Sequence, residues 1–463
     1  MDSRVKAFFD SLKGKRVTFC GIGGSNLPLC RIFREKGALV TACDKRSREQ
    51  LGQQGDELER LGVELRLGDG YLKNLDGDMI FRTPGMRYHL EELEQARERG
   101  SAVTSEMELF FDLCPCKIYA VTGSDGKTTT TTVISEMLKA AGKRVHLGGN
   151  IGHPLLPEIE TIEPDDAAVV ELSSFQLISM RRSPDVAVVT NLSPNHLDIH
   201  KDMAEYIDAK KNIILHQNAF GKAVLNADNE ITAAFASDVR GQARMFSRKQ
   251  PSRYGAWLRD DGMILVGGQE VMAASEIRIP GVHNVENYLA AISAVWGDVP
   301  PEKIIQVARS FQGVAHRTEF VREIDGVRYY NDSIGTSPTR TISGTLSLYD
   351  RKIILIAGGY DKKIPFDMLG PVIVEKVKVL ILMGATADKI EQSVKNAGSY
   401  REGSPEIIRV GSMEEAVKAA RSHAVSGDIV SLSPACASFD MYPNFEARGN
   451  HFKELVNREA GES

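Results

Sequence analysis

The sequence predicts an α/β protein with three domains, each built on a largely parallel β-sheet. Its 463 residues are too many for one ordinary core, and a hydrophobic content of 42% is enough for several. Short apolar runs alternate with amphipathic stretches, as in parallel strands joined by crossover helices. Three strand–loop–helix segments place boundaries near residues 105 and 313. We therefore expect domains at 1–105, 106–313 and 314–463.

The predicted strands are short and apolar, and two helices follow glycine-rich loops. We expect helices at 27–37 and 133–143. In chain order, the expected strands are residues 16–20, 38–44, 117–122, 166–170, 327–332, 352–359 and 377–385. The first and last domains should be Rossmann-like, and the central one of the P-loop type.

Composition excludes several classes of partner. The formal net charge is only -5, and both signs are mixed along the chain, so we expect neither nucleic-acid nor membrane binding. The amino-terminal segment has no apolar signal-peptide core, and no window approaches the roughly 18 apolar residues of a membrane span. The six cysteines show no zinc-ligand spacing. We expect reduced cysteines in a cytoplasmic protein.

The first glycine-rich loop, Gly21-Ile-Gly23-Gly24-Ser25-Asn26, joins a predicted strand to a helix. Such a loop presents backbone amides to a phosphate or diphosphate. Asp44 ends the next strand, where the dinucleotide fingerprint has an acid for a ribose hydroxyl, but Asn26 replaces the third glycine of that fingerprint. The alternatives are a tight packing turn and an NAD-dependent oxidoreductase. A Rossmann-like domain that holds a nucleotide diphosphate fits all of these observations.

The second loop, Gly123-Ser124-Asp125-Gly126-Lys127-Thr128, lies between a strand and a helix. Its amides, lysine and hydroxyl are the groups that bind phosphates and Mg²⁺ in a P-loop. Val121 stands where the full pattern has its first glycine. An ordinary turn is the alternative, and the strand–loop–helix context favours ATP.

Three further residues are candidate metal ligands. Glu171 comes at the end of a predicted strand, where side chains point into the ligand crevice of α/β folds. His196 lies in a loop, and Lys210 follows it by fourteen residues. Taken singly, each has a simpler interpretation as a surface acid, a loop residue or a solvated helix lysine.

Six motifs together resemble the Mur ligase family, and part of the set is shared with folylpolyglutamate synthases. They are GSDGKTT (123–129), ELSSFQL (171–177), NHLDIH (195–200), PGVHNVEN (280–287), AHR (315–317) and NDS-x-x-T (331–336). The resemblance runs from about residue 16 to 456. It implies a three-domain, ATP-dependent ligase that adds an amino acid to a peptidoglycan precursor.

Within the family, ELSSFQL and segment 433–452 resemble the branch that adds D-glutamate. The resemblance implies that UDP-N-acetylmuramoyl-L-alanine and D-glutamate are joined through an acyl phosphate, with release of ADP and phosphate. It further implies a first domain for the UDP substrate, a central domain for ATP and a third domain for the amino acid, in a monomer. The alternatives are another amino-acid ligase of this or the folylpolyglutamate type, and an inactive nucleotide-binding regulator.

The resemblance also implies roles in phosphoryl transfer. Two Mg²⁺ ions would be held with Lys210 as a carbamate. The catalytic set is Lys127, Glu171, His196, Lys210 and Arg317, and the metal-binding set is Thr128, Glu171, His196 and Lys210. The ATP-binding set is Gly123, Ser124, Asp125, Gly126, Lys127, Thr128, Thr129, His283, Asn284, Asn287, Arg317 and Asp332.

The implied substrate contacts divide between the outer domains and one edge of the central domain. Asp44 and Arg46 would meet the uridine, and Gly23 and Ser25 the diphosphate. Contacts to the muramoyl group and to D-glutamate complete the set: Asn150 and Gln176 for the former, and Thr336, Lys362, Ser438 and Phe445 for the latter.

Four positions depart from the family pattern. Asp125 replaces an asparagine, and its charge beside a triphosphate should cost some affinity. Ile334 stands where some relatives carry lysine, Asn26 replaces a glycine, and Thr83 replaces a serine. None of these changes removes an expected metal ligand.

Overall fold

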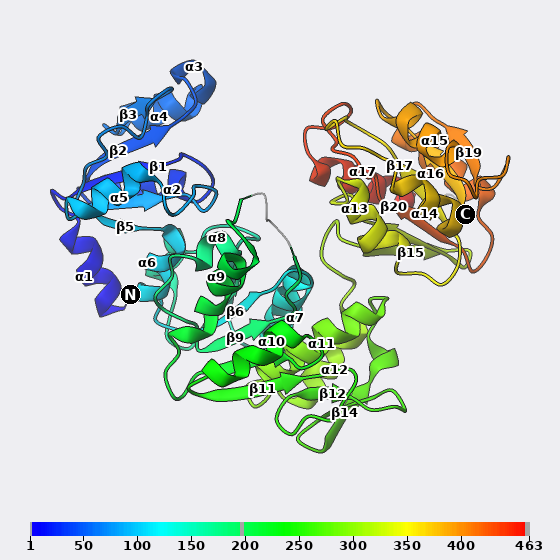
Figure 1. Cartoon of the computed structure of the whole chain (residues 1–463), viewed down its shortest axis with the longest axis horizontal. Coiled ribbons are helices and arrows are strands. Elements are labelled where there is room, and N and C mark those ends of the chain that lie inside the picture. Colours follow the sequence, from blue (N-terminus) through cyan, green and yellow to red (C-terminus); the bar gives the residue numbers. More distant parts are fainter. Residues whose placement is uncertain (1, 195–198, 459–463) are drawn as a thin grey trace. The chain divides into compact units, whose positions relative to one another are not determined.

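The computed structural model describes residues 2–194 and 199–458 (Figure 1). The chain forms two compact units. One contains residues 1–276 and 283–309, and the other contains 277–282 and 310–463. Each unit has its own parallel β-sheets, so the predicted α/β class is confirmed. The domain boundaries near 105 and 313 remain predictions.

The first sheet has five parallel strands in the order β3-β2-β1-β4-β5. Its strands are β1 Arg16–Cys20, β2 Leu39–Asp44, β3 Glu64–Leu67, β4 Met79–Arg82 and β5 Ala102–Thr104. The accompanying helices are α1 Ser3–Ser11, α2 Asn26–Glu35, α3 Arg48–Leu51, α4 Gln53–Arg60, α5 Glu91–Glu98 and α6 Glu106–Leu113. The order reverses between β1 and β4, and the carboxyl ends of strands at such a switch point form a ligand crevice.

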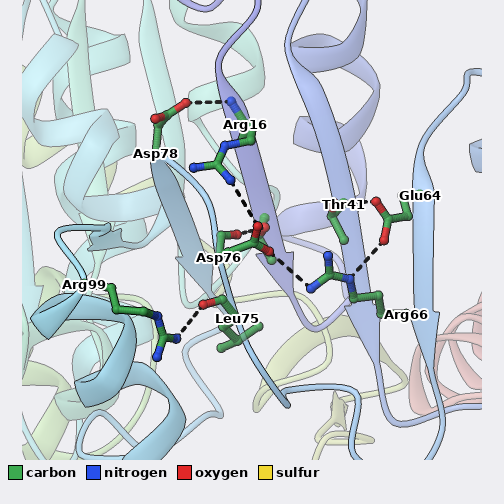
Figure 2. Close-up of polar contacts among 9 residues, drawn as sticks. Arg16, Thr41, Glu64, Arg66, Leu75, Asp76, Asp78 and Arg99 are labelled. Atoms are coloured by element: carbon green, nitrogen blue, oxygen red, sulfur yellow. Dashed lines mark hydrogen bonds and ion pairs between the residues drawn. The ribbon is translucent and has the colours of Figure 1, made fainter.

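A polar network extends along this sheet from Arg16, at the amino end of β1, to Arg66 in β3 (Figure 2). Asp78 accepts from the amide of Arg16 over 2.8 Å. Asp76 lies between two arginines, 3.1 Å from Arg16 and 3.3 Å from Arg66. These pairs are partly exposed, so each contributes little energy, but together they hold the segment before β4 against β1 and β3.

The central sheet has six parallel strands in the order β11-β10-β9-β6-β8-β7. They are β6 Lys117–Thr122, β7 Val145–Gly149, β8 Ala167–Glu171, β9 Val186–Val189, β10 Lys222–Asn226 and β11 Gln242–Phe246. The main helices are α7 Lys127–Ala140, α8 Ser174–Leu177, α9 Met203–Leu215, α10 Glu230–Ala234, α11 Val282–Val295 and α12 Pro301–Ser310. Short 3₁₀ helices span Leu156–Thr161, Phe235–Asp238 and Ala274–Glu276.

A small antiparallel sheet accompanies this domain, with strands β12 Ala256–Leu258, β13 Met263–Val266 and β14 Gln269–Ala273. The central strands themselves are almost continuously buried, as expected for a parallel sheet covered on both faces. The predicted helix at 133–143 was placed too late, because α7 already begins at Lys127 and includes the run of threonines.

The second unit holds a six-stranded sheet in the order β15-β16-β20-β17-β18-β19, in which only β15 pairs antiparallel. Its strands are β15 Glu319–Ile324, β16 Val327–Asn331, β17 Ile353–Ala357, β18 Val377–Leu382, β19 Glu406–Arg409 and β20 Ile429–Leu432. The helices are α13 Pro338–Thr341, a π-helical turn at Ile342–Leu346, α14 Leu369–Lys376, α15 Ala387–Lys395, α16 Met413–His423 and α17 Phe445–Arg458. Apolar clusters on both faces of this sheet form the core of the unit.

The seven strands expected from the sequence all occur, with ends that differ by at most three residues. All six cysteines are free and buried, and the sulfur atoms of Cys114 and Cys116 lie 3.6 Å apart. In the described part of the chain, no helix is both long and apolar enough to cross a membrane.

Candidate active site

The phosphate loop is shaped by two glycines that no other residue can replace without strain. Gly126 is left-handed, with φ of 77°, and Gly123 has φ of 151°. A Cβ at Gly126 would collide with the side chain of Asn287, and one at Gly123 with the side chain of Thr190. The loop therefore turns sharply from β6 into α7, whose first amides face the loop as they do in anion-binding helices.

Residues beyond β9 hold the loop in place. The amide of Asp125 donates to Oδ1 of Asn191 over 3.0 Å, and its carbonyl accepts from the Thr190 hydroxyl over 2.6 Å. The Ser124 hydroxyl contacts the hydroxyl of Tyr206 at 2.9 Å. The Asp125 side chain itself is exposed, so water screens the extra charge that the sequence predicted beside the triphosphate. Sequence reasoning missed Thr190, Asn191 and Tyr206, because none of them lies in a phosphate-binding motif.

Lys127 folds back over the loop. Its Nζ donates to the carbonyls of Gly123 and Ser124 over 3.0 and 2.9 Å. These carbonyls hold the ammonium at the mouth of the loop, where negative phosphates would compete for it. The contact of Lys127 with phosphate stays a prediction.

Glu171 ends β8 beside this loop and is almost fully buried, with 1% of its surface exposed. Its Oε1 accepts from Nδ2 of Asn150 over 2.8 Å. Its Oε2 is buried, and among the described residues it has no hydrogen-bond partner. A buried carboxylate oxygen without a partner is costly, and a hard cation such as Mg²⁺ is the ligand that would satisfy it.

Lys210 comes from α9 and is 2% exposed. Its Nζ donates to the Thr122 hydroxyl over 3.0 Å and to the Gly123 carbonyl over 2.9 Å. Burial, followed by the positive charge of Lys127, lowers the pKa of Lys210 well below its usual value, and Glu171 only partly opposes this shift. A larger share of this amine is therefore neutral near pH 7 than for an exposed lysine.

Three of the four candidate metal ligands lie at or beside the phosphate loop. Thr128 is the second residue of α7 and is buried, and Glu171 and Lys210 lie close to the same loop. His196 lies outside the described residues. Within the described ranges, no group of three or more His, Cys, Asp or Glu side chains could hold a metal. Few protein ligands suit Mg²⁺, which usually keeps water and binds substrate phosphates.

The first two turns of α11 lie against the phosphate loop. The Thr130 hydroxyl donates to Oδ1 of Asn287 over 3.3 Å, and Nδ2 of Asn287 donates to Oδ1 of Asn284 over 3.1 Å. Both asparagines are buried, whereas His283 is exposed at the start of the helix. The structure therefore brings Asn284 and Asn287 to the phosphate loop, while their contact with the nucleotide stays a prediction.

A cavity of about 650 Å³ opens at the switch point of the first sheet, lined by Gly21, Gly23, Asp44 and Arg46 among others. Asp44 accepts from the amide of Ile22 over 2.8 Å and from Nε of Arg46 over 2.9 Å. Burial alone would raise the pKa of Asp44, but these hydrogen bonds outweigh it and lower the pKa. Asp44 is therefore ionised at neutral pH and keeps the loop in shape.

Two neighbouring residues, Ser25 and Asn26, end the first glycine-rich loop. Asn26 is fully buried, and its Nδ2 donates to the carbonyls of Gly21 and Cys20 over 3.0 and 3.3 Å. The asparagine thus ties the loop to the end of β1, which a glycine could not do. Ser25 precedes α2 without a side-chain cap bond.

A second cavity, of about 400 Å³, shares Gly85, Met86 and Arg87 with the first and reaches Phe175 and His200. Arg87 is exposed, and the described residues offer it no hydrogen bond or ion pair. Because it borders both cavities, its guanidinium is available to a negatively charged ligand that spans them. Sequence reasoning missed Arg87, which lies outside every motif.

Buried contacts join this region to the central sheet. Nη2 of Arg82 donates to the Phe175 carbonyl over 2.9 Å and to the Ser179 hydroxyl over 2.7 Å. Gln176 closes a capping box at the start of α8, where its Oε1 accepts from the amide of Ser173 over 2.9 Å. Gln176 therefore has a structural role, and its contact with substrate remains a prediction.

In the second unit, Nζ of Lys362 donates to the hydroxyl of Thr336 over 3.1 Å. The contacts of these two residues with D-glutamate stay predictions. Ser438 is 3% exposed, and Phe445 starts α17. Arg448, which sequence reasoning missed, is buried and donates to the carbonyls of Ser333, Ala437 and Cys436 over 2.8, 3.0 and 3.1 Å. This guanidinium holds together the segments that carry Thr336, Ser438 and Phe445.

Asp332 and Arg317 belong to the same unit. Asp332 is 1% exposed and accepts from the hydroxyls of Thr345 and Ser433 over 2.8 and 2.9 Å. Burial raises the pKa of Asp332 to about 6 despite these donors. His316, beside Arg317, has φ of 61° and contacts Asn331 through Nδ1 at 3.0 Å. The nucleotide contacts of Asp332 and Arg317 remain predictions.

Two family models match the chain. The Mur ligase middle domain matches residues 121–295, and the Mur ligase glutamate ligase domain matches residues 316–436.

Curated relatives match over almost their entire lengths. The UDP-N-acetylmuramoylalanine–D-glutamate ligase of Acetivibrio thermocellus is 54% identical and covers 99% of both chains. The enzymes of the same name from Clostridium beijerinckii and Clostridium kluyveri are 53% and 51% identical; the aligned regions cover 98% and 97% of this chain and 99% and 98% of theirs.

Solved structures share the fold at lower identity. The UDP-N-acetylmuramate-alanine ligase of Thermotoga maritima matches with a TM-score of 0.58 at 18% identity, covering 97% of this chain and 100% of its own. A UDP-N-acetylmuramoyl-L-alanyl-D-glutamate–2,6-diaminopimelate ligase matches with a TM-score of 0.57 at 16% identity, covering 97% and 94%. At such identities the likeness concerns the fold alone.

Proposed function

This chain belongs to the Mur ligase family, and we propose that it uses ATP to join D-glutamate to UDP-N-acetylmuramoyl-L-alanine in peptidoglycan synthesis. Relatives of that name are 50–54% identical over nearly the full length. The geometric observation that carries the proposal is the buried Oε2 of Glu171 beside the phosphate loop, which has no hydrogen-bond partner among the residues that the structure describes. A cation there and a triphosphate on the loop are what an ATP-dependent ligase needs.

The first chemical stage is phosphoryl transfer. The alanyl carboxylate of the acceptor attacks the γ-phosphorus of ATP, giving an acyl phosphate and ADP. Lys127 and the amides before α7 bind the β- and γ-phosphates, and Asn284 and Asn287 support the nucleotide. Mg²⁺, when bound, neutralises the charge that would otherwise repel the attacking carboxylate. Glu171 and Thr128 are the residues of this chain that would hold it.

Lys210 has a part in this stage as a carbamate. Its neutral amine attacks CO₂ and loses a proton, which converts the lysine into an anionic oxygen ligand. The position of Nζ, 2.9 Å from the Gly123 carbonyl, and the lowered pKa of the amine support this proposal. With His196 it would serve a second Mg²⁺. Arg317 adds positive charge at the γ-phosphate, and Asp332 contacts the ATP ribose.

The second stage is amide formation. The α-amine of D-glutamate attacks the acyl phosphate, passes through a tetrahedral intermediate and expels phosphate. Lys362 pairs with the side-chain carboxylate of D-glutamate, while Thr336 and Ser438 donate hydrogen bonds and Phe445 forms a wall. Arg448 holds the segments that carry these residues through its hydrogen bonds to the carbonyls of Ser333, Cys436 and Ala437.

The acceptor lies along the first unit. Its uridine enters the 650 Å³ cavity near Asp44 and Arg46, its diphosphate meets Gly23 and Ser25, and its muramoyl group reaches Asn150. Backbone amides that face phosphates would bind the diphosphate of UDP in the same way as that of a dinucleotide. We further propose that the enzyme acts as a cytoplasmic monomer.

Phosphate release from Mg-ATP tests the function. We expect release that requires both UDP-N-acetylmuramoyl-L-alanine and D-glutamate, with a product heavier by one glutamyl residue. Turnover with only a different acceptor or amino acid would contradict the proposed substrates but not the assignment to the family. Nucleotide binding without turnover for any pairing would identify a regulator.

A further inference from the structure

A cavity of about 470 Å³ lies at the edge of the central domain, between β11 and the small β12–β14 sheet. Gln242 at the amino end of β11 and Gly267 between β13 and β14 contribute to its lining. Figure 1 shows β11 and β12 close together, and the backbone of Ser247 pairs with that of Trp257 between them. No step of the ligase reaction uses this cavity.

The cavity and the phosphate loop lie at opposite edges of one sheet. Strands β6, β9, β10 and β11 run parallel, and the loop follows the carboxyl end of β6. The cavity is at the amino end of β11. The five residues of this strand span about 16 Å, which separates the cavity from the carboxyl edge of the sheet. Helix α11 connects the two regions, because Asn287 in its second turn meets Gly126 and the residue after its last turn, Trp296, lines the cavity.

Two aromatic side chains form part of the cavity wall. Trp296 and Tyr254 both line it, and Tyr254 is 57% exposed. The guanidinium of Arg253 lies over the tyrosine ring, with its central carbon 5.0 Å from the ring centroid. Flat, partly exposed aromatic rings of this kind favour stacking of another planar ring.

The cavity also carries uncompensated positive charge. Arg244 and Arg253 line it, and none of its described lining residues is acidic. Nη1 of Arg244 donates to the Trp296 carbonyl over 3.2 Å, and Nη2 lies 3.5 Å from the amide oxygen of Gln242. Neither partner is a carboxylate. Guanidinium groups without a carboxylate favour a planar anion.

The nearest acid does not neutralise this charge. Asp298 interacts electrostatically with Arg244, but both of its oxygens accept from Lys117, over 2.8 and 2.9 Å. A second amine, that of Lys222, lies 3.6 Å from the same carboxylate. Three cations, Lys117, Lys222 and Arg244, therefore share one carboxylate, which leaves positive charge at the cavity.

We propose that this cavity is a second ligand site, separate from the catalytic centre, for a small planar aromatic anion. The ring of the ligand packs against Trp296 and Tyr254, and its carboxylate or phosphate pairs with Arg244 and Arg253. A volume near 470 Å³ suits a ligand of two fused rings with one anionic group.

Calorimetry with simple probes tests the proposal. The full chain, saturated with a non-hydrolysable ATP analogue and Mg²⁺, is titrated with 2-naphthoate, 2-naphthyl phosphate and the neutral 2-naphthamide. We expect saturable binding of at least one anion, and binding of the amide weaker by about tenfold or more. The two anions distinguish a carboxylate ligand from a phosphate ligand. Equal binding of the amide, or no saturation below about 5 mM, would overturn the proposal.

Matched variants locate the binding. Arg253→Gln, at an exposed position, should weaken anion binding about tenfold and leave the ligase rate unchanged. The control is Arg259→Gln on the neighbouring β12–β13 turn, where Arg259 pairs with Asp261 and Glu270 and no effect is expected. Because the chain has two tryptophans, Trp257→Phe leaves Trp296 as the only one, and its fluorescence should change with the anion. Identical affinities for Arg253→Gln and Arg259→Gln would contradict the assignment.

Discussion

Nδ2 of Asn150 donates to Oε1 of Glu171 over 2.8 Å, and the second oxygen of the same buried carboxylate has no partner among the described residues. The amide thus orients the carboxylate so that Oε2 is the oxygen left for a cation. This arrangement links a residue predicted to contact the muramoyl group with one predicted to hold Mg²⁺, and it explains why both lie at the same strand ends.

Glu171→Gln should lower the ligase kcat by about 100-fold or more, because an amide oxygen is a weak Mg²⁺ ligand. Phosphate release at increasing Mg²⁺ concentration measures the effect, and the Mg²⁺ requirement should shift upward. Asn150→Ala, which keeps the carboxylate and loses only its orientation, should have a smaller effect on Mg²⁺ dependence. A Glu171→Gln enzyme with normal Mg²⁺ dependence would exclude Glu171 as a ligand.

Activity should depend on dissolved CO₂ through Lys210. Removal of CO₂ and bicarbonate from the assay should lower the rate, and their return should restore it, because the neutral, buried amine can form a carbamate. Lys210→Ala should lose most activity and show no response to bicarbonate. Intact-mass or crystallographic detection of the carbamate provides the direct measurement. A wild-type rate that is independent of bicarbonate after long depletion would argue against the modification.

Lys362→Ala should raise the KM for D-glutamate by about 10- to 100-fold, since a charge-assisted contact with the substrate carboxylate is lost. The KM values for ATP and the UDP-linked acceptor should stay near those of the wild type. The adjacent Lys363 supplies a matched control: its amide donates to Asp361, and Lys363→Ala should leave all three values unchanged. Equal effects of the two substitutions would contradict a direct contact between Lys362 and D-glutamate.

Arg87→Ala should raise the KM for the UDP-linked acceptor by about three- to tenfold, with kcat and the KM for ATP little changed. Arg87 borders the cavities of about 650 and 400 Å³, where the proposed acceptor would bring two phosphates. Arg60→Ala, which removes an exposed arginine from α4 of the same domain, is the control. An unchanged acceptor KM would place the acceptor away from Arg87.

Lys222 should make stability depend on alkaline pH. Burial is the largest cause that lowers its pKa, to about 8, whereas an unfolded lysine titrates near 10.4. Between these values the unfolded chain binds more protons, so the free energy of unfolding rises with pH, by up to about 1.4 kcal/mol per unit. Below about pH 8 both the folded and the unfolded chain carry the proton on Lys222, so the free energy of unfolding no longer changes with pH through this residue.

Denaturant unfolding of wild type and Lys222→Met between pH 7 and 10.5 measures this slope. The difference in unfolding free energy between the two proteins should grow with pH in favour of the wild type across that window. A constant difference would show that Lys222 titrates normally. The substitution leaves the ion pair of Lys117 with Asp298 in place.

Much of the architecture and family followed from the sequence alone. Apolar runs such as 117–122 and 377–385 predicted the parallel strands because buried strands need nearly continuous apolar residues. Glycines 123 and 126, with Lys127, predicted the phosphate loop because local chain geometry and residue chemistry lie within a few consecutive positions. The order of the motifs predicted the family, which the comparisons confirm.

Other features arise from contacts between distant segments, and only the tertiary structure decided them. The support of the phosphate loop by Thr190 and Asn191, the burial of Lys210 and the orphaned oxygen of Glu171 depend on which strands are neighbours. Sequence alone also placed the start of α7 too late, because a run of β-branched threonines favours strand locally, whereas packing on the sheet stabilises it as helix. Residue types and spacing thus determined the chemistry available to this protein, and the folded sheets decided which groups meet, how deeply they are buried and therefore how they are charged.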